Sequence, residues 1–356
     1  MLRWMMVLLW VVSLTGLTGV AAGQTVRLQG AGATFPNPMY QRWVTEYQRL
    51  HPNIKIDYQS QGSGAGIRAI TERTVAFAGS DAPMTRRQRE ELARNGFEVL
   101  HIPTVAGAVV MAYNLPGVTG ELRLSGEVIA DIYMGRISNW SDRRIAELNP
   151  GLSLPSMNIV PAFRTDGSGT TFIFTSYLST QSEEFRETIG NGTNVRWPTG
   201  QGGRGNEGVT QVVQSTPGAI GYVELIYAAA NNIPHALLRN RAGKFVKASP
   251  ETVANAGEGA AQEMRDDFLA VSLWNQPGDD VYPISGFTYI LIFRDLGYLR
   301  NRTDAQALLN FLAWATSEGQ AMAAEMGYAP LSPAVREKVQ TLLGSLTFRG
   351  EPIRPE

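Results

Sequence analysis

Four short loops rich in glycine, serine and threonine constrain the fold of this chain more than any other feature of its sequence. Each loop ends an apolar run, and in three of them an amphipathic segment follows. Unpaired N–H groups and aligned peptide dipoles at a helix start attract anions, so such a loop is suited to hold one. The loops lie far apart in sequence, and the fold must assemble any single pocket that they build. They are Gly30–Phe35, Gln61–Gly66, Ala78–Asp81 and Arg164–Thr171.

The segments between these loops follow the pattern of an α/β protein. Tyr40, Trp43 and Tyr47 recur at helical spacing, and residues 54–58 then alternate as a strand does. Residues 97–114 predict a long strand with few charges, suited to carry the chain from one domain into the next. Further predicted elements are strands at 75–78, 158–163, 218–223 and 282–293, helices at 126–134, 142–148 and 169–178, a helix capped by Thr85 with Gln88 and closed by Asn95-Gly96, a glycine-rich loop at 197–208, and a final helix capped by Thr303 with Gln306.

The length of the chain favours two domains. About 333 residues follow the N-terminal apolar stretch, more than one hydrophobic core usually supports. Alternating strands and helices favour open, mostly parallel sheets, whose ligands lie beyond the carboxyl ends of the strands. The glycine loops occur at such ends, so two domains facing each other would enclose a ligand.

The N-terminus predicts export. Arg3 precedes an apolar stretch over residues 4–12, and Ala21-Ala22-Gly23 offers a cleavage site. The apolar core is shorter than the roughly 20 residues of a spanning helix, which favours a signal peptide at residues 1–23 over an uncleaved anchor. The chain has no cysteine, which excludes a lipid-modified cysteine and any disulfide. We therefore expect a soluble, exported protein.

Charge and histidine content exclude several other classes. The chain has 31 basic and 32 acidic residues, a balance that favours neither nucleic acid nor an anionic membrane as partner. No spacing of the three histidines resembles a metal site, and we predict neither a metal nor a cofactor. We interpret the histidines as isolated surface or loop residues; they are His51, His101 and His235. We interpret three tryptophans as core or interdomain packing; they are Trp43, Trp140 and Trp314.

The loop sequences resemble one known family. The runs Gly-Ala-Gly-Ala-Thr-Phe-Pro, Gly-Ser-Gly-Ala-Gly, Ser-Asp-Ala-Pro-Met and Arg-Thr-Asp-Gly-Ser-Gly-Thr are similar, in this order, to those of the periplasmic phosphate-binding proteins of bacterial high-affinity phosphate ABC transporters. The resemblance extends over essentially the whole chain after the N-terminal stretch. Those four runs occupy residues 30–36, 62–66, 80–84 and 164–170, and further similar segments are 131–133, Trp140, 148–151 and 218–224.

This resemblance implies a fold and a function. The fold would be the two-domain α/β fold of periplasmic binding proteins, type II, with the ligand between the domains. The first domain would be discontinuous, residues 24–108 plus 284–356, and the second would be residues 109–283, with hinges near 107–112 and 281–286. The protein would be a monomer in the periplasm that captures inorganic phosphate and delivers it to the permease and ATPase subunits of an ABC transporter. It would perform no covalent chemistry.

The resemblance also implies a set of phosphate ligands. Hydroxyl groups would come from serines and threonines, backbone N–H groups from the helix starts, and two parallel hydrogen bonds from one arginine. Asp166 would hold that arginine in place. The implied ligands are Thr34, through both its N–H and its hydroxyl, Phe35, Ser63, Asp81, Arg164, Ser168, Gly169 and Thr170.

Asp81 would select phosphate over sulfate. Phosphate near neutral pH carries at least one O–H, whereas sulfate carries none. An ionised Asp81 accepts that hydrogen bond from phosphate but faces sulfate as an unpaired like charge. The cost of an unmet buried polar contact makes the difference at least a few kcal/mol, roughly a hundredfold or more. Arsenate is also protonated, so Asp81 would not reject it.

One position departs from the family pattern. Gly64 stands where relatives commonly have a second serine. If that serine donates its hydroxyl, this chain lacks one contact with the ligand. If it donates its N–H, glycine serves equally.

Two other functions remain as alternatives. A hydrolase would also place serine beside glycine, but neither Ser63 nor Ser168 has glycine two positions before and two after it, as a nucleophile elbow requires. No Walker motif is present. A binding protein for another oxyanion, such as sulfate or molybdate, is the second alternative, and Asp81 argues against it.

Overall fold

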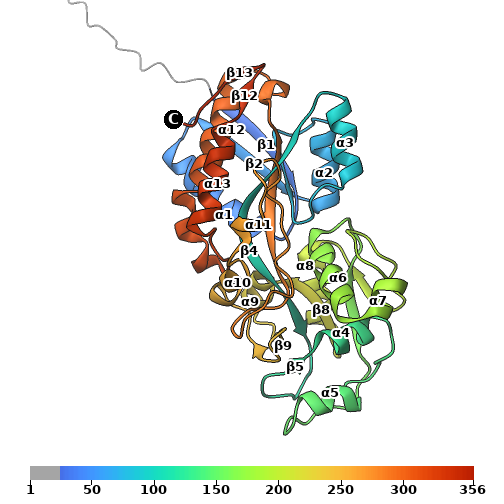
Figure 1. Cartoon of the computed structure of the whole chain (residues 1–356). Coiled ribbons are helices and arrows are strands. Elements are labelled where there is room, and N and C mark those ends of the chain that lie inside the picture. Colours follow the sequence, from blue (N-terminus) through green and yellow to red (C-terminus); the bar gives the residue numbers. More distant parts are fainter. Residues whose placement is uncertain (1–24) are drawn as a thin grey trace, which may run out of the picture.

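The computed structural model describes residues 25–356, so the predicted signal peptide at residues 1–23 lies outside the described part of the chain. Eight strands form one sheet in the order β2-β1-β3-β11-β4-β8-β6-β7. Figure 1 shows that this sheet runs through two lobes, one above the other in that view. We name the lobes by their strands: lobe I holds β1, β2, β3, β11 and the first part of β4, and lobe II holds the rest of β4 with β6, β7 and β8.

Lobe I is built around parallel strands with one antiparallel strand inserted. β1 pairs in parallel with β2 and β3, and β11 pairs antiparallel with β3 and β4. The elements of this lobe are β1 (Val26–Gly32), α1 (Asn37–Leu50), β2 (Ile54–Ser60), α2 (Ser63–Thr71), β3 (Phe77–Ser80), α3 (Arg86–Arg94), β11 (Ser285–Phe293), η1 (Leu296–Tyr298), α12 (Arg302–Ala315), η2 (Glu318–Met322), η3 (Ala324–Met326), α13 (Pro333–Leu343), β12 (Thr347–Phe348) and β13 (Glu351–Pro352).

Lobe II repeats the same design on a smaller scale. β6 pairs in parallel with β7 and β8. The elements between β4 and β11 are β5 (Arg123–Leu124), α4 (Gly126–Tyr133), α5 (Arg143–Leu148), β6 (Val160–Arg164), α6 (Gly169–Gln181), α7 (Glu183–Thr188), β7 (Gln201–Gly203), α8 (Gly205–Ser215), β8 (Ala219–Glu224), α9 (Leu225–Ala230), β9 (Leu237–Arg239), β10 (Phe245–Val246), α10 (Pro250–Ala256) and α11 (Ala260–Glu263). β5, β9 and β10 form a separate three-stranded sheet.

A single strand joins the two lobes. β4 (Val99–Tyr113) has 15 residues, all of them buried. Its residues 99–108 pair with β11, and its residues 109–113 pair with β8. The change of partner occurs between Ala108, which faces Ser285, and Val109, which faces Glu224. The predicted long strand at 97–114 is therefore confirmed, with both lobes attached to it.

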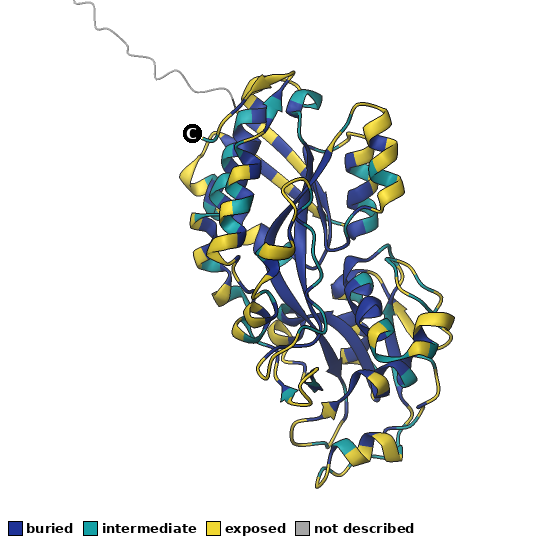
Figure 2. Ribbon diagram, in the orientation of Figure 1, coloured by how far each residue is buried: buried dark blue, intermediate teal, exposed yellow. Residues whose placement is uncertain are grey.

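The core lies on both faces of the sheet, beneath the helices (Figure 2). Trp43 in α1 and Trp140 are fully buried, and their indole N–H groups donate to the carbonyl oxygens of Gly319 and Gly218 at 2.8 and 2.9 Å. Pairing the indole N–H lets such a large side chain be buried without leaving its polar group unpaired. The interpretation of these two tryptophans as core is confirmed, and Trp314 packs half-buried against Tyr47.

Local sequence signals set several helix boundaries. Thr85 and Gln88 form the predicted capping box, and α3 ends at Asn95 as expected. The cap predicted at Thr303 is wrong, because Asn301 accepts a hydrogen bond from the N–H of Asp304 at 2.8 Å and the helix starts earlier. That helix is not the final one either, since α13 follows it.

The glycine-rich segment 197–208 is not only a loop, as was expected. It contains β7 and the start of α8. A Cβ added to Gly203 would lie 2.4 Å from the carbonyl carbon of Gly208, so these glycines allow a strand and a helix start to pack backbone to backbone. Composition alone suggested a loop where a strand and a helix start pack closely together.

His101 corrects a second expectation, since it lies buried in β4 and not at the surface or in a loop. Its Nε2 accepts a hydrogen bond from the N–H of Met84 at 2.9 Å, and burial lowers its pKa to about 3. Among residues 25–356 there is no group of three or more His, Cys, Asp or Glu residues that could hold a metal ion. No helix in this part of the chain is both long and apolar enough to cross a membrane.

Candidate anion-binding site

The four glycine loops meet where the two lobes face each other. Thr34 and Phe35 follow β1, Ser63 begins α2 and Asp81 follows β3, all in lobe I. The residues from lobe II lie at the end of β6 and at the start of α6. The structure buries all eight predicted ligands, Thr34, Phe35, Ser63, Asp81, Arg164, Ser168, Gly169 and Thr170.

Close packing between the loops explains why they are rich in glycine. Gly32, at the end of β1, has a φ of +142°, and a Cβ there would lie 2.1 Å from the carbonyl oxygen of Gly79 in β3. Only glycine allows both the backbone conformation and this approach. The loops after β1 and β3 are thereby held side by side, which places Thr34 near Asp81.

Ser63 connects the two lobes. Its Oγ accepts hydrogen bonds from the N–H of Asp81 at 3.2 Å and from the N–H of Gly169, in lobe II, at 3.1 Å. Beside it, the N–H of Gly64 donates to the carbonyl oxygen of Gly167 at 2.9 Å. The N–H at position 64 thus bonds across the lobes to the protein itself, and glycine supplies that bond as well as serine would.

Arg164 is held rigidly by Asp166. The side chain of Arg164 is 1% exposed, and its Nε and Nη2 donate to the two carboxylate oxygens of Asp166 at 2.8 and 2.5 Å. Burial raises the pKa of Asp166, but the hydrogen bonds and charge of Arg164 outweigh it, so this pKa lies below its ordinary value. Nη1 remains for other partners and donates to Thr170 Oγ1 at 3.3 Å. The predicted role of Asp166 as the partner of the arginine agrees with this geometry.

Asp81 is the least ordinary group of the site. Its Oδ1 accepts from the hydroxyl of Thr288 at 2.7 Å, and Ser63 Oγ lies 3.4 Å from its Oδ2. Burial raises the pKa of Asp81 to about 7, although Thr288, Arg164 and Ser63 act in the opposite direction. Near neutral pH the carboxyl therefore exists in both forms, whereas the sequence argument assumed that it is fully ionised.

Several buried backbone donors of these loops lack a protein acceptor. Among residues 25–356, the N–H groups of Thr34, Phe35 and Thr170 make no hydrogen bond with the protein. All three residues are at most 3% exposed. Buried N–H groups in proteins are almost always paired, so three unpaired ones beside Arg164 indicate an acceptor from outside the chain. A compact oxyanion meets that requirement.

Two tyrosines fix the turn that carries Thr34 and Phe35. The hydroxyl of Tyr328, from lobe I, donates to the carbonyl oxygen of Phe35 at 2.7 Å. The hydroxyl of Tyr227, from lobe II, donates to the carbonyl oxygen of Thr34. Because the two tyrosine hydroxyls bind its carbonyl oxygens, the turn presents its N–H groups to the space between the lobes.

The chain is similar to a family model and to curated relatives. A family model described as a PBP superfamily domain matches residues 19–319. The Phosphate-binding protein PstS of Pasteurella multocida is 42% identical over 318 residues, covering 89% of this chain and 90% of the relative. The protein of the same name in Methanocaldococcus jannaschii is 37% identical and covers 87% of this chain and 85% of the relative. The chain belongs to the PstS family of phosphate-binding proteins.

Solved structures agree with this family in fold. A high affinity periplasmic phosphate-binding protein (PfluDING) bound with phosphate has a TM-score of 0.70 at 21% identity, covering 88% of this chain and 93% of that one. A phosphate-binding protein from Stenotrophomonas maltophilia has a TM-score of 0.68 at 20% identity, with the same coverage. The expected two-domain α/β fold is confirmed.

Two residues near the loops were missed by the sequence analysis of this PstS family member. Thr288 lies in β11, and no sequence pattern links it with Asp81, 207 positions away. Asn206 is the second residue of α8, and its side chain reaches both Thr34 Oγ1 and Thr170 Oγ1, at 2.7 and 3.2 Å. The Gly-Asn-Glu-Gly run at 205–208 was the available signal, but it was interpreted as loop.

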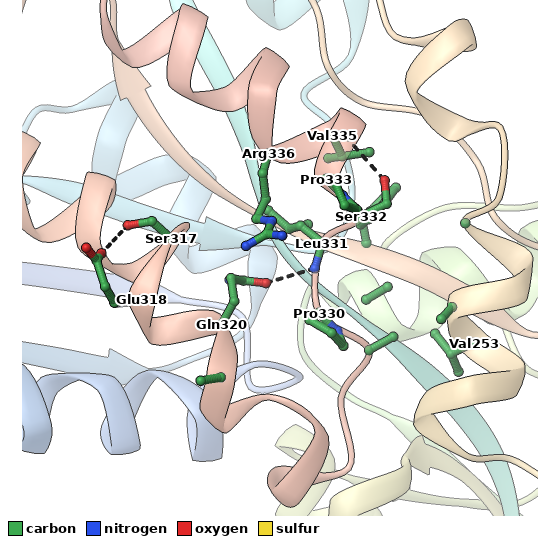
Figure 3. A pocket seen from close by; sticks show the side chains of 16 residues that line it. Val253, Ser317, Glu318, Gln320, Pro330, Leu331, Ser332, Pro333, Val335 and Arg336 are labelled. Carbon is green, nitrogen blue, oxygen red and sulfur yellow. Dashed lines mark hydrogen bonds between the residues drawn. The ribbon is translucent and has the colours of Figure 1, made fainter.

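A pocket of about 550 Å³ lies elsewhere, between α10, η2 and the start of α13 (Figure 3). Gln320 Oε1 accepts from the N–H of Leu331 at 2.8 Å, and Ser317 bonds to Glu318 beside it. None of the predicted ligands lines this pocket. It is distinct from the site that the glycine loops build.

Proposed function

We propose that this protein captures inorganic phosphate between its two lobes and delivers it to the membrane permease of an ABC transporter for import. Three unpaired, buried N–H groups at Thr34, Phe35 and Thr170, beside the guanidinium of Arg164, carry the proposal. They supply neutral donors around one cation, which suits a small oxyanion. The names of the curated relatives support phosphate as that anion and a binding role, not an enzymatic one.

The proposed ligands form two groups. From lobe I come Thr34, Phe35, Ser63 and Asp81. From lobe II come Arg164, Ser168, Gly169 and Thr170, with Asp166 as the support of the arginine. Ser168 Oγ accepts from the N–H of Thr171 at 3.0 Å, which leaves its hydroxyl hydrogen to donate to the anion.

Asp81 supplies the charged acceptor that the other ligands lack. The remaining groups of the proposed set are hydrogen-bond donors, and one of them, the N–H of Gly169, already donates to Ser63 Oγ. A protonated phosphate oxygen needs an acceptor, and the carboxylate of Asp81 is the one charged acceptor of the set. This division between donors and one acceptor favours phosphate over sulfate whenever Asp81 is ionised.

We further propose that the lobes move as hinged domains, residues 24–108 plus 284–356 against 109–283. The change of strand partner in β4 between Ala108 and Val109 supports a hinge there. Opening would release the cross-lobe bonds of Ser63 and Gly64, and phosphate would restore them on closure. The permease would then distinguish the closed form from the open one. We expect the working protein to be a periplasmic monomer after removal of residues 1–23.

Calorimetric titration of purified, phosphate-stripped protein tests the proposal. The pH should be about 8, because burial raises the pKa of Asp81 to about 7 and the carboxyl is then mostly ionised. We expect one phosphate per chain and no competition by an equal concentration of sulfate. Arg164→Ala should abolish the signal, whereas the control Arg144→Ala should leave it unchanged. Arg144 is an exposed arginine of lobe II that pairs with Asp131 and Asp142. Equal binding of sulfate, or no binding of phosphate, would refute the proposal.

A further inference from the structure

Asn206 occupies a position between the lobes that the proposed ligand set does not use. Its side chain is fully buried at the start of α8. The amide Nδ2 donates to Thr34 Oγ1 of lobe I at 2.7 Å and to Thr170 Oγ1 of lobe II at 3.2 Å. Its backbone N–H donates to Thr34 Oγ1 as well, at 3.2 Å. One residue therefore contacts a proposed ligand from each lobe.

A third partner fixes which way the amide faces. The backbone N–H of Glu224, at the end of β8, donates to Asn206 Oδ1 at 2.9 Å. A buried N–H requires an acceptor, so the oxygen of the amide must face Glu224. Its NH₂ group must then face the two threonines, as a donor only.

The bonds around the two hydroxyl oxygens decide where their hydrogens point. A threonine hydroxyl has two lone pairs and one hydrogen. Thr34 Oγ1 accepts from both the N–H and Nδ2 of Asn206. Thr170 Oγ1 accepts from Arg164 Nη1 at 3.3 Å and from Asn206 Nδ2. With both lone pairs occupied, each hydroxyl can only donate to a further group.

We propose that Asn206 is a positioning residue that makes the hydroxyls of Thr34 and Thr170 obligatory hydrogen-bond donors to the anion. The inference rests on the proposed function, because it takes phosphate as the further group. Without Asn206, either hydroxyl is able to rotate and accept from a neighbouring N–H. With it, the Thr170 hydroxyl is preset before the ligand arrives, the Thr34 hydroxyl is oriented when the lobes close, and the acceptor role in the site is left to Asp81.

The same contacts tie closure of the lobes to the geometry of the ligand. Thr34 and Asn206 lie in different lobes and meet only when these approach each other. The hydroxyl of Thr34 is therefore fully oriented in the closed form alone. Phosphate should gain this donor on closure, which favours the closed form over the open one.

Two substitutions separate the donor role of Asn206 from its size. Asn206→Asp keeps the shape and the acceptor for Glu224 but replaces the NH₂ group with an oxygen. The threonine hydroxyls would then donate to this carboxylate, away from the anion, and the added negative charge would repel phosphate. We expect the phosphate Kd to rise at least about a hundredfold. Asn206→Ala removes the donor without adding charge and should raise the Kd by about tenfold.

Asn149 provides a matched control. It is a buried asparagine of lobe II whose Nδ2 donates to the carbonyl oxygens of Arg123 and Ile145, at 2.8 and 2.9 Å, and whose Oδ1 accepts from the N–H of Arg123 at 2.8 Å. Asn149→Ala removes a comparable number of buried hydrogen bonds beside α5, away from the glycine loops. It should lower the melting temperature but leave the phosphate Kd within about twofold of the wild type.

A double-mutant cycle distinguishes positioning from a merely structural role. Phosphate titrations would compare the wild type, Asn206→Ala, Thr170→Val and the double variant. Because Asn206 acts through the Thr170 hydroxyl and also on Thr34, the loss of affinity in the double variant should be clearly smaller than the product of the two single losses. Losses that multiply in the double variant, or an Asn206→Ala protein that binds like the wild type, would overturn the inference. A wild type that binds no phosphate would instead refute the proposed function, and the two failures are thereby distinguishable.

Discussion

The raised pKa of Asp81 predicts how discrimination against sulfate depends on pH. Sulfate carries no proton, so it can lie against Asp81 without charge repulsion only if the carboxyl takes a proton from solvent. Burial raises the pKa of Asp81 to about 7, so below that pH the proton is already present. Above it, each further pH unit costs sulfate about 1.4 kcal/mol, a factor of about ten in affinity.

The assay is competition by sulfate against phosphate in calorimetric titrations from about pH 6 to 9, across the pKa of about 7 at Asp81. For the wild type, the inhibition constant of sulfate should be flat below this pKa and rise about tenfold per pH unit well above it. Asp81→Asn carries an amide that does not titrate, so its sulfate constant should lose this slope.

A control substitution separates this effect from general electrostatics. Asp304→Asn replaces a buried carboxylate in α12 of lobe I that pairs with Arg300, and it should keep the wild-type slope. A wild-type sulfate constant that does not change between the two ends of this range would refute the reasoning. So would an Asp81→Asn protein that keeps the slope, because another group would then supply the proton.

Three further predictions concern the same loops. Arg164→Ala should weaken phosphate binding more than Ser168→Ala does, since it removes the one full positive charge of the proposed set; equal losses in titration would contradict this ranking. Gly169→Ala would place a Cβ 2.5 Å from Ser63 Oγ and 2.6 Å from Asp81 Oδ2, so the lobes should fail to close, and phosphate titration should show lost binding with little change in the melting temperature of the ligand-free protein. Between about pH 4 and 7 the folded protein keeps the Asp81 proton, whereas an unfolded chain has lost it. The free energy of unfolding of the wild type should therefore fall as the pH rises through this interval. Denaturant unfolding should therefore find Asp81→Asn more stable than the wild type above about pH 7 but not at pH 4, and an equal difference at both ends would contradict the pKa shift.

The sequence predicted the elements whose signals are local. The helix spacing of Tyr40, Trp43 and Tyr47 and the capping box at Thr85 depend on residues a few positions apart, and they predicted α1 and α3. Asn301 was passed over because Thr303 with Gln306 also fits a capping pattern, and only packing decides between them. Such choices shift a helix boundary without changing the fold.

Only the site residues that belong to a local sequence motif could be predicted. The predicted ligands lie on the glycine loops, in short continuous runs that resemble those of a known family. Thr288 and Asn206 have no such run, because each acts on a loop that is distant in the chain. The pKa of Asp81 depends on burial by both lobes, a property that no stretch of sequence contains. What the sequence could not provide was therefore the contacts between loops.

The position of β11 has a consequence for how the chain folds. β11 is the last long strand to be synthesised, yet it lies between β3 and β4 in the middle of the sheet. A chain that ends before residue 285 leaves the facing edges of these two strands unpaired, and such non-local pairing is slow to form. The N-terminal half should therefore stay unfolded until the C-terminal residues arrive. Thr288 arrives with them, so the carboxyl of Asp81 receives its hydrogen-bond donor only at the end of this order of assembly.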